Sequence, residues 1–121
     1  LPTRTRRQRQ MCIRDRQGEP GGLSGAPLFE LSTQKLAQTF LAAKQRIPII
    51  GVGGVDSAET AYTKVKAGAS LIQLYTALIY KGPRLFSEIN KGLSEALKND
   101  NIDHISKAVG IEADYWASRE V

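Results

Sequence analysis

Residues 47–56 read IPIIGVGGVD, and this stretch decides the fold. Its first four residues form an apolar run of strand length, with Pro48 near the start. Three glycines occupy positions 51, 53 and 54, and the pair Asp56-Ser57 follows where a helix N-cap is expected. Glycine lets an anion approach the backbone, and loop amides at the start of a helix point at it. The stretch therefore predicts a strand, a candidate phosphate loop and a helix in succession.

A second unit of the same kind follows at residues 67–76, AGASLIQLYT. Tyr75 and Thr76 end its strand, where a threonine hydroxyl and two backbone amides can donate hydrogen bonds to the same anion. Each loop alone also has an interpretation without a ligand. The glycine run is then a tight strand-to-helix turn, Tyr75 packs at the rim of the fold, and Thr76 caps the next helix. Two such loops in succession favour a phosphate clamp.

The rest of the pattern alternates helices with strands, which is typical of parallel βαβ units. Two strands cannot form a sheet that is covered on both faces. The sequence therefore predicts the end of a larger α/β fold, most simply the last quarter of a (β/α)8 TIM barrel, in which the loops after strands 7 and 8 often build a phosphate site. The expected elements are a helix over 33–45 capped at Ser32-Thr33, a strand over 46–51, a helix over 58–67 between Ser57 and Gly68, a strand over 70–74, a helix from Pro83 to Lys98, a short helix near 102–109 and an indeterminate tail over 114–121.

The positive charge of the chain is confined to its beginning. The sequence has a formal net charge of +5, and residues 1–16 contain six arginines and one aspartate, which account for all of it. This segment is either a basic arm that binds nucleic acid or a segment foreign to the domain. It has no aromatic residue for base stacking, so the foreign origin is favoured. The expected division is 1–16 as this foreign segment, 17–98 as the barrel part and 99–121 as a helical extension.

Several other candidates carry little chemistry. GGLSG at 21–25 would lie on the same rim in a barrel and is otherwise a flexible loop. Asp56 is expected as a loop or N-cap residue, His104 at the surface and Lys81 at a helix entry. With one cysteine, Cys12, and one histidine, neither an intrachain disulfide nor a Cys/His metal site is expected. No Ser-His-Asp or paired-carboxylate pattern is present, and neither a signal peptide nor an apolar run of membrane-spanning length is found.

Taken together, the strings GGLSGAPL, PIIGVGGVDS, AGASLIQLYT and IYKGP resemble the C-terminal part of the dihydroorotate dehydrogenases, over about residues 21–91. The ending Leu74-Tyr75-Thr76 is similar to the quinone-dependent class 2 branch. The resemblance implies a (β/α)8 barrel with FMN at the C-terminal face of its strands. It also implies oxidation of dihydroorotate to orotate in pyrimidine (UMP) biosynthesis, with a membrane quinone as electron acceptor. Another FMN- or phosphate-binding TIM-barrel oxidoreductase is the alternative, against which GGLSG and LYT argue.

By the same resemblance, Gly25 and Gly54 match FMN contacts, and Tyr75 and Thr76 match the pair that meets the FMN phosphate. No catalytic residue is carried over. The family's serine base, its orotate-binding asparagines, its flavin-contacting lysine and its membrane-docking helices lie upstream of the matching strings, and Ser24 belongs to a different loop. The chain is thus expected to be inactive alone, and soluble or aggregating through exposed strand faces. The whole enzyme would lie peripherally on the cytoplasmic face of the cell inner membrane and bind no nucleic acid.

Overall fold

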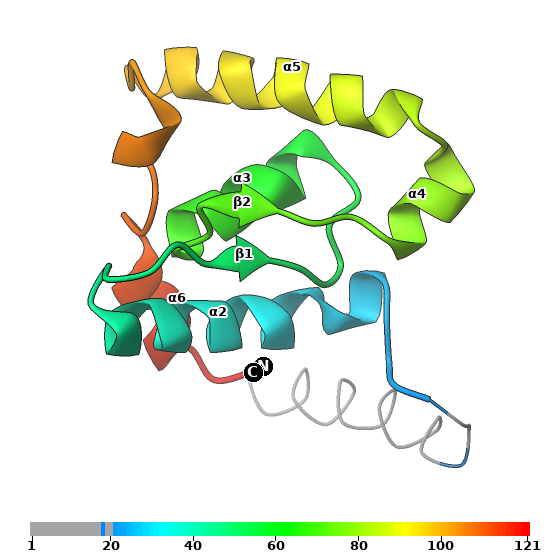
Figure 1. Ribbon diagram of the computed structural model, residues 1–121, viewed down its shortest axis with the longest axis horizontal. Helices are drawn as coiled ribbons and strands as arrows, with labels where there is room; N and C mark the ends of the chain where they lie inside the picture. The colour runs from blue at the N-terminus through cyan, green and yellow to red at the C-terminus, as the bar shows by residue number, and fades with distance from the viewer. Residues whose placement is uncertain (1–17, 19–20) are drawn as a thin grey trace.

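The computed structural model describes Gly18 and residues 21–121 (Figure 1). The Arg-rich segment 1–16, with the nucleic-acid interpretation attached to it, lies outside the described residues. The elements in chain order are the 3-10 turn η1 (Ala26–Leu28), α2 (Phe29–Ala43), β1 (Ile50–Gly51), α3 (Ala58–Ala67), β2 (Leu71–Ile72), α4 (Thr76–Lys81), α5 (Arg84–Asn99), the 3-10 turn η2 (Ile105–Lys107) and α6 (Ala113–Ser118).

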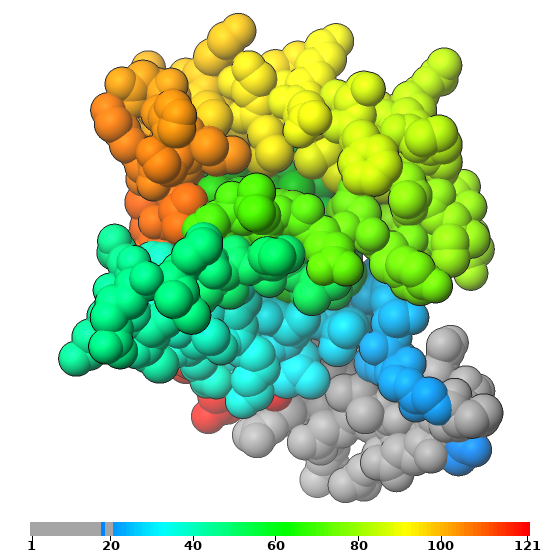
Figure 2. Space-filling model, viewed as in Figure 1, coloured from blue at the N-terminus to red at the C-terminus, as the bar shows by residue number. Residues whose placement is uncertain are grey.

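The two strands form a parallel pair, in which Ile50 lies opposite Leu71 and Gly51 opposite Ile72. In Figure 1 this pair lies between α2 on one side and α5 on the other. Ile50 and Leu71 remain 54% and 61% exposed, and the space-filling view shows the strand segments reaching the surface between the two helices (Figure 2). Apolar strand residues at the surface are what the expected quarter of a barrel would present.

Helix α3 has the predicted bounds because its signals are local. The Ser57 hydroxyl accepts a hydrogen bond from the Thr60 N–H at 3.2 Å and forms a capping box with it. Gly68, with φ at 129°, ends the helix. Both residues were predicted in these roles.

Helix α2 begins four residues earlier than predicted, so its proposed N-cap was wrong. Pro27 lies in the turn η1, and the helix continues directly from it. Thr33 is buried inside the helix, where its hydroxyl donates to the Phe29 carbonyl at 2.6 Å instead of capping. The helix ends at Ala43, two residues early, because Lys44 adopts a left-handed conformation.

Four further expectations need correction. Both strands are two residues long, because each has only the other to pair with. Residues 76–81 form α4, which the sequence did not predict, and Lys81 ends this helix instead of opening α5. The expected helix over 102–109 is only the turn η2. The indeterminate tail contains α6, whose Trp116 is buried with Leu36 and Ala37 of α2.

The remaining core joins α3 to α5. Leu85 and Ile89 of α5 pack with Ala61 of α3 and with Val55 from the loop after β1. This packing fixes the loop that carries the glycine run relative to the helices. Within the described ranges, no helix is long and apolar enough to cross a membrane.

Candidate functional site

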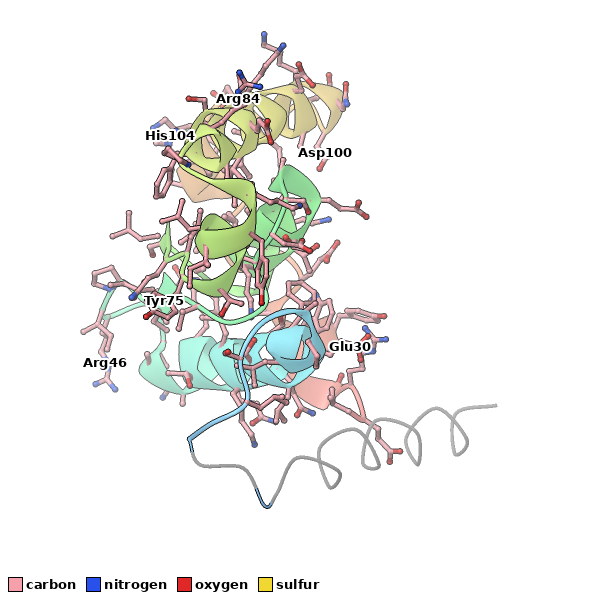
Figure 3. The ribbon with its side chains drawn as sticks, turned by 90° about the vertical axis from the view of Figure 1, so that its right-hand side faces the viewer. Glu30, Arg46, Tyr75, Arg84, Asp100 and His104 are labelled. Atoms are coloured by element: carbon pink, nitrogen blue, oxygen red, sulfur yellow. The ribbon has the colours of Figure 1, made fainter. Side chains whose placement is uncertain are left out.

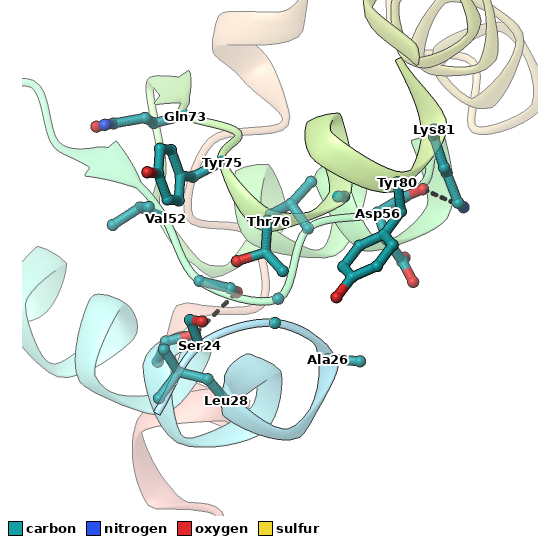
Figure 4. Close-up of a pocket in the computed structure, with 16 residues that line it drawn as sticks. Ser24, Ala26, Leu28, Val52, Asp56, Gln73, Tyr75, Thr76, Tyr80 and Lys81 are labelled. Carbon is teal, nitrogen blue, oxygen red and sulfur yellow. Dashed lines mark hydrogen bonds between the residues drawn. The ribbon is translucent and has the colours of Figure 1, made fainter. Parts of the chain in front are cut away.

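The four residues predicted as cofactor contacts line one pocket of about 570 Å³ (Figure 4). Gly25 comes from the segment before η1, Gly54 from the loop after β1, and Tyr75 and Thr76 from the end of the loop after β2. Small-molecule sites typically have volumes of roughly 300–1,000 Å³. The fold thus brings three loops, far apart in sequence, to one hollow of ligand size.

The first and third loops touch each other. A Cβ atom on Gly25 would lie 3.5 Å from the Thr76 methyl carbon, so the GGLSG segment lies beside the start of α4, just after the loop that follows β2. Ser24 also lines the pocket. The expectation that GGLSG lies on the same rim as the two strand ends is met by this arrangement.

The glycines after β1 approach the start of α2 very closely. A Cβ on Gly54 would lie 2.6 Å from the Phe29 Cβ and 2.8 Å from its nitrogen, and φ at Gly54 is 73°. A Cβ on Gly53 would lie 2.8 Å from the Ser32 hydroxyl. These glycines are therefore required by close packing against α2, and they also line the pocket. The tight strand-to-helix turn and the pocket wall are the same segment.

Ser32 and Lys64 form a polar group behind these glycines that the sequence analysis missed. The Ser32 hydroxyl lies 3.0 Å from the Phe29 carbonyl and 3.1 Å from the Gly53 carbonyl, and it can donate to either. It accepts a hydrogen bond from the Lys64 ammonium. The Lys64 Nζ also lies 5.0 Å from the centre of the Phe29 ring. A signal existed in the sequence, because Lys64 falls between Ala61 and Ala67 on the inner face of α3.

Burial changes the acidity of Lys64. The residue has no exposed surface, and removal of its charged form from water lowers the pKa of its ammonium from 10.5 to about 8. At neutral pH the group therefore still carries its positive charge.

Two charged side chains lie at the pocket mouth. The Lys81 ammonium donates to the Asp56 backbone carbonyl at 2.7 Å (Figure 4). The Asp56 carboxylate accepts from the Thr60 hydroxyl at 3.2 Å, in the loop position expected from sequence. Lys81 can turn toward an anion, whereas Asp56 opposes one. The anion-binding capacity of the pocket therefore depends mainly on backbone amides and hydroxyls.

The remaining candidates occupy other places. Tyr75 precedes α4, and its side chain is exposed, so it does not pack against the rim of this chain. His104 is exposed as expected and accepts a hydrogen bond from the Ser106 N–H at 3.2 Å. Figure 3 shows His104 beside α5, away from Tyr75. It is therefore no part of the pocket.

Comparison with known proteins identifies the family. A family model described as dihydroorotate dehydrogenase matches residues 3–97. Among curated relatives, the dihydroorotate dehydrogenase (quinone) of Brucella anthropi is 52% identical over 107 residues, which is 88% of this chain and 29% of the relative. That of Brucella ovis is 50% identical over the same shares. The chain thus spans less than a third of the length of these relatives. Because the family match begins at residue 3, the foreign origin of 1–16 stays a prediction.

Solved structures agree with this assignment. The ligand-free enzyme of Eimeria tenella superposes with a TM-score of 0.75 at 32% identity, over 80% of this chain and 27% of that one. Its complex with ferulenol gives the same TM-score and identity, over 81% and 26%. The parallel strand pair and its helices correspond to a part of that TIM barrel. The chain belongs to the dihydroorotate dehydrogenase family.

Proposed function

We propose that this chain forms the flavin-phosphate end of an FMN-dependent dihydroorotate dehydrogenase that uses a quinone as electron acceptor. The observation that carries the proposal is the convergence of Gly25, Gly54, Tyr75 and Thr76 on one pocket. These are the residues that the family resemblance pairs with FMN, and they come from three separate loops.

The donor set of the pocket suits a phosphate. Gly54 and Thr76 line the hollow, so a backbone amide with no side chain of its own and a threonine hydroxyl are at hand for an anion, whereas the Ser32 hydroxyl donates to a backbone carbonyl. Lys81 adds a positive charge at the mouth. Phosphate groups bind well to backbone amides and hydroxyls at the ends of parallel strands, so the residues present fit this part of FMN.

The role of this chain is to bind and orient. Bound FMN would supply the redox chemistry, by taking a hydride from dihydroorotate and passing electrons to the quinone. The residues described here would fix the phosphate and so set the direction in which the flavin extends. We assign no catalytic residue to them. Peripheral contact with the cytoplasmic face of the inner membrane would be made by other parts of the whole enzyme.

A chimera tests the proposal. The matching segment of the Brucella anthropi enzyme is replaced by the corresponding residues of this chain, and the product is called the chimera below. We expect purified chimera to contain FMN and to reduce a quinone analogue in the presence of dihydroorotate, with the parent enzyme as control. The 121-residue chain alone should show no such activity. A folded chimera that binds no FMN, or an active 121-residue chain, would contradict the proposal.

A further inference from the structure

We propose that Lys64 is a positioning residue for the flavin phosphate: through Ser32 it orients the Gly53-Gly54 peptide, and it supplies a buried positive charge behind the pocket wall. This inference rests on the proposed function, because it needs an anion in the pocket. It concerns a residue outside the pocket lining, which the family resemblance did not point to.

The first support is the isolation of the charge. Lys64 is fully buried, and within the part of the chain that the structure describes no carboxylate forms an ion pair with it. Its contacts there are the Ser32 hydroxyl, the Phe29 carbonyl at 3.5 Å and the Phe29 ring. An uncompensated buried charge is costly to the fold. An anion in the adjacent pocket would supply the missing countercharge.

The second support is the hydrogen-bond chain toward the pocket. Lys64 donates to Ser32, and the Ser32 hydroxyl can then donate to the Gly53 carbonyl at 3.1 Å. The Gly53 carbonyl and the Gly54 N–H belong to one peptide group, and the described peptide bonds are trans. A trans peptide holds its carbonyl and N–H on opposite sides. When Ser32 holds the Gly53 carbonyl, the Gly54 N–H therefore points away from Ser32. Because Lys64 donates to the Ser32 oxygen, the hydroxyl proton is left for a backbone carbonyl, that of Gly53 at 3.1 Å or that of Phe29 at 3.0 Å.

The third support is the position of the ammonium. Ser32 lines the pocket, and the Lys64 Nζ is hydrogen-bonded to Ser32 from behind. One side chain thus separates the buried charge from the hollow. Charges interact more strongly in such surroundings than in water. The phosphate of FMN would be attracted even without direct contact.

The other lysine of the same helix provides a matched control. Lys66 lies two residues further along α3, and its ammonium forms an ion pair with Glu112 at 3.0 Å. It does not line the pocket or touch Ser32. A Lys66→Met substitution removes the same charge from the same helix without touching the proposed chain of contacts.

The test compares FMN with riboflavin, which lacks the phosphate. Dissociation constants of the flavin-free chimera for both are measured by fluorescence titration. We expect Lys64→Met to weaken FMN binding about tenfold or more and to leave riboflavin binding within about twofold, whereas Lys66→Met changes neither. Ser32→Ala should also weaken FMN more than riboflavin, by a smaller factor.

The outcomes separate the two proposals. A chimera that binds FMN no more tightly than riboflavin contradicts the proposed function itself. A chimera that prefers FMN and keeps this preference after Lys64→Met overturns only the role of Lys64. Should Lys64→Met fail to fold, Ser32→Ala decides, because an equal loss for both flavins overturns the inference and a selective loss of FMN supports it.

Discussion

The two ends of helix α2 use the same device for different purposes. At its C-terminal end the Phe40 ring lies between two glycines, and a Cβ on Gly68 or Gly110 would come within 2.5 or 2.3 Å of it. At its N-terminal end a Cβ on Gly53 would come within 2.8 Å of Ser32, and one on Gly54 within 2.6 Å of Phe29. In both places a glycine lets another segment approach the helix more closely than any side chain would allow.

The two ends of α2 differ in the chemical groups that the glycines enclose. The C-terminal end encloses an aromatic ring that is only 8% exposed, which contributes to stability. The N-terminal end encloses a hydroxyl and, beside an open hollow, an ammonium that forms no ion pair within the described residues. Polar groups held at a cost to stability, next to a pocket, are typical of a binding site. The comparison predicts that substitutions at one end change stability and that those at the other change ligand binding.

The largest effect is expected for Phe40→Ala in the chimera. Loss of a buried aromatic side chain lowers the free energy of unfolding by about 3–5 kcal/mol. The ratio of FMN to riboflavin affinity should stay unchanged, since this end is remote from the pocket. Denaturant unfolding and flavin titration measure both quantities. Phe86→Ala, at a side chain that is 49% exposed, is the control. Equal losses of unfolding free energy for the two variants would refute the assignment of Phe40 as a residue that contributes to stability by its burial.

Gly54→Ala should come next. The new Cβ would overlap Phe29, and φ at 73° adds backbone strain, so we expect a loss of about 2–4 kcal/mol together with weaker FMN binding. Gly82→Ala is a matched control, because φ there is 75° but nothing lies within 4 Å of the added carbon. It should cost only about 1 kcal/mol. Similar losses at both positions would show that strain alone, and not close approach to α2, requires Gly54.

The pH dependence of the free energy of unfolding should reveal the lowered pKa of Lys64. Its pKa is about 8 in the folded chain against 10.5 ordinarily, so between these values the unfolded chain holds more protons and stability rises with pH. From pH 7.5 to 9.5 we expect a gain of about 1–2 kcal/mol in the flavin-free chimera, absent in Lys64→Met. Tyr62, whose pKa burial and the Asp100 hydrogen bond raise from 10.0 to about 12, titrates above this window. A variant that keeps the full gain would exclude Lys64 as its source.

The smallest effect is expected for Lys66→Met, on α3, which takes part in neither end of α2. Its ion pair with Glu112 is partly exposed, and pairs of this kind contribute about 0–1 kcal/mol. Thermal unfolding of the chimera should therefore change little. A loss as large as that of Phe40→Ala would mean that the surface of α3 contributes as much to stability as the packed end of α2.

The elements that could be predicted from sequence are those set by neighbouring residues. Ser57 and Gly68 mark α3 because a cap needs only its own helix. The family strings likewise gave Gly25, Gly54, Tyr75 and Thr76, which the structure brings to one pocket, although their contact with FMN stays a proposal.

The features that sequence reasoning missed depend on distant contacts. Ser32 looked like a helix cap, but the chain before it was already helical from Phe29. Lys64 was not singled out from the sequence, because the packing of α2 against α3 buries it. A helical extension over 99–121 was expected, but the bounds of α6 were not, because Trp116 finds its partner, Phe29, at the other end of the described chain.

A crystal structure of the chimera with FMN tests the central claim most directly. We expect the flavin phosphate within hydrogen-bonding distance of the Gly54 and Thr76 backbone amides, with the Lys64 ammonium still bonded to Ser32 behind them. Electron density that places the phosphate away from these amides, with the pocket between Gly25 and Thr76 filled by water, would contradict the account.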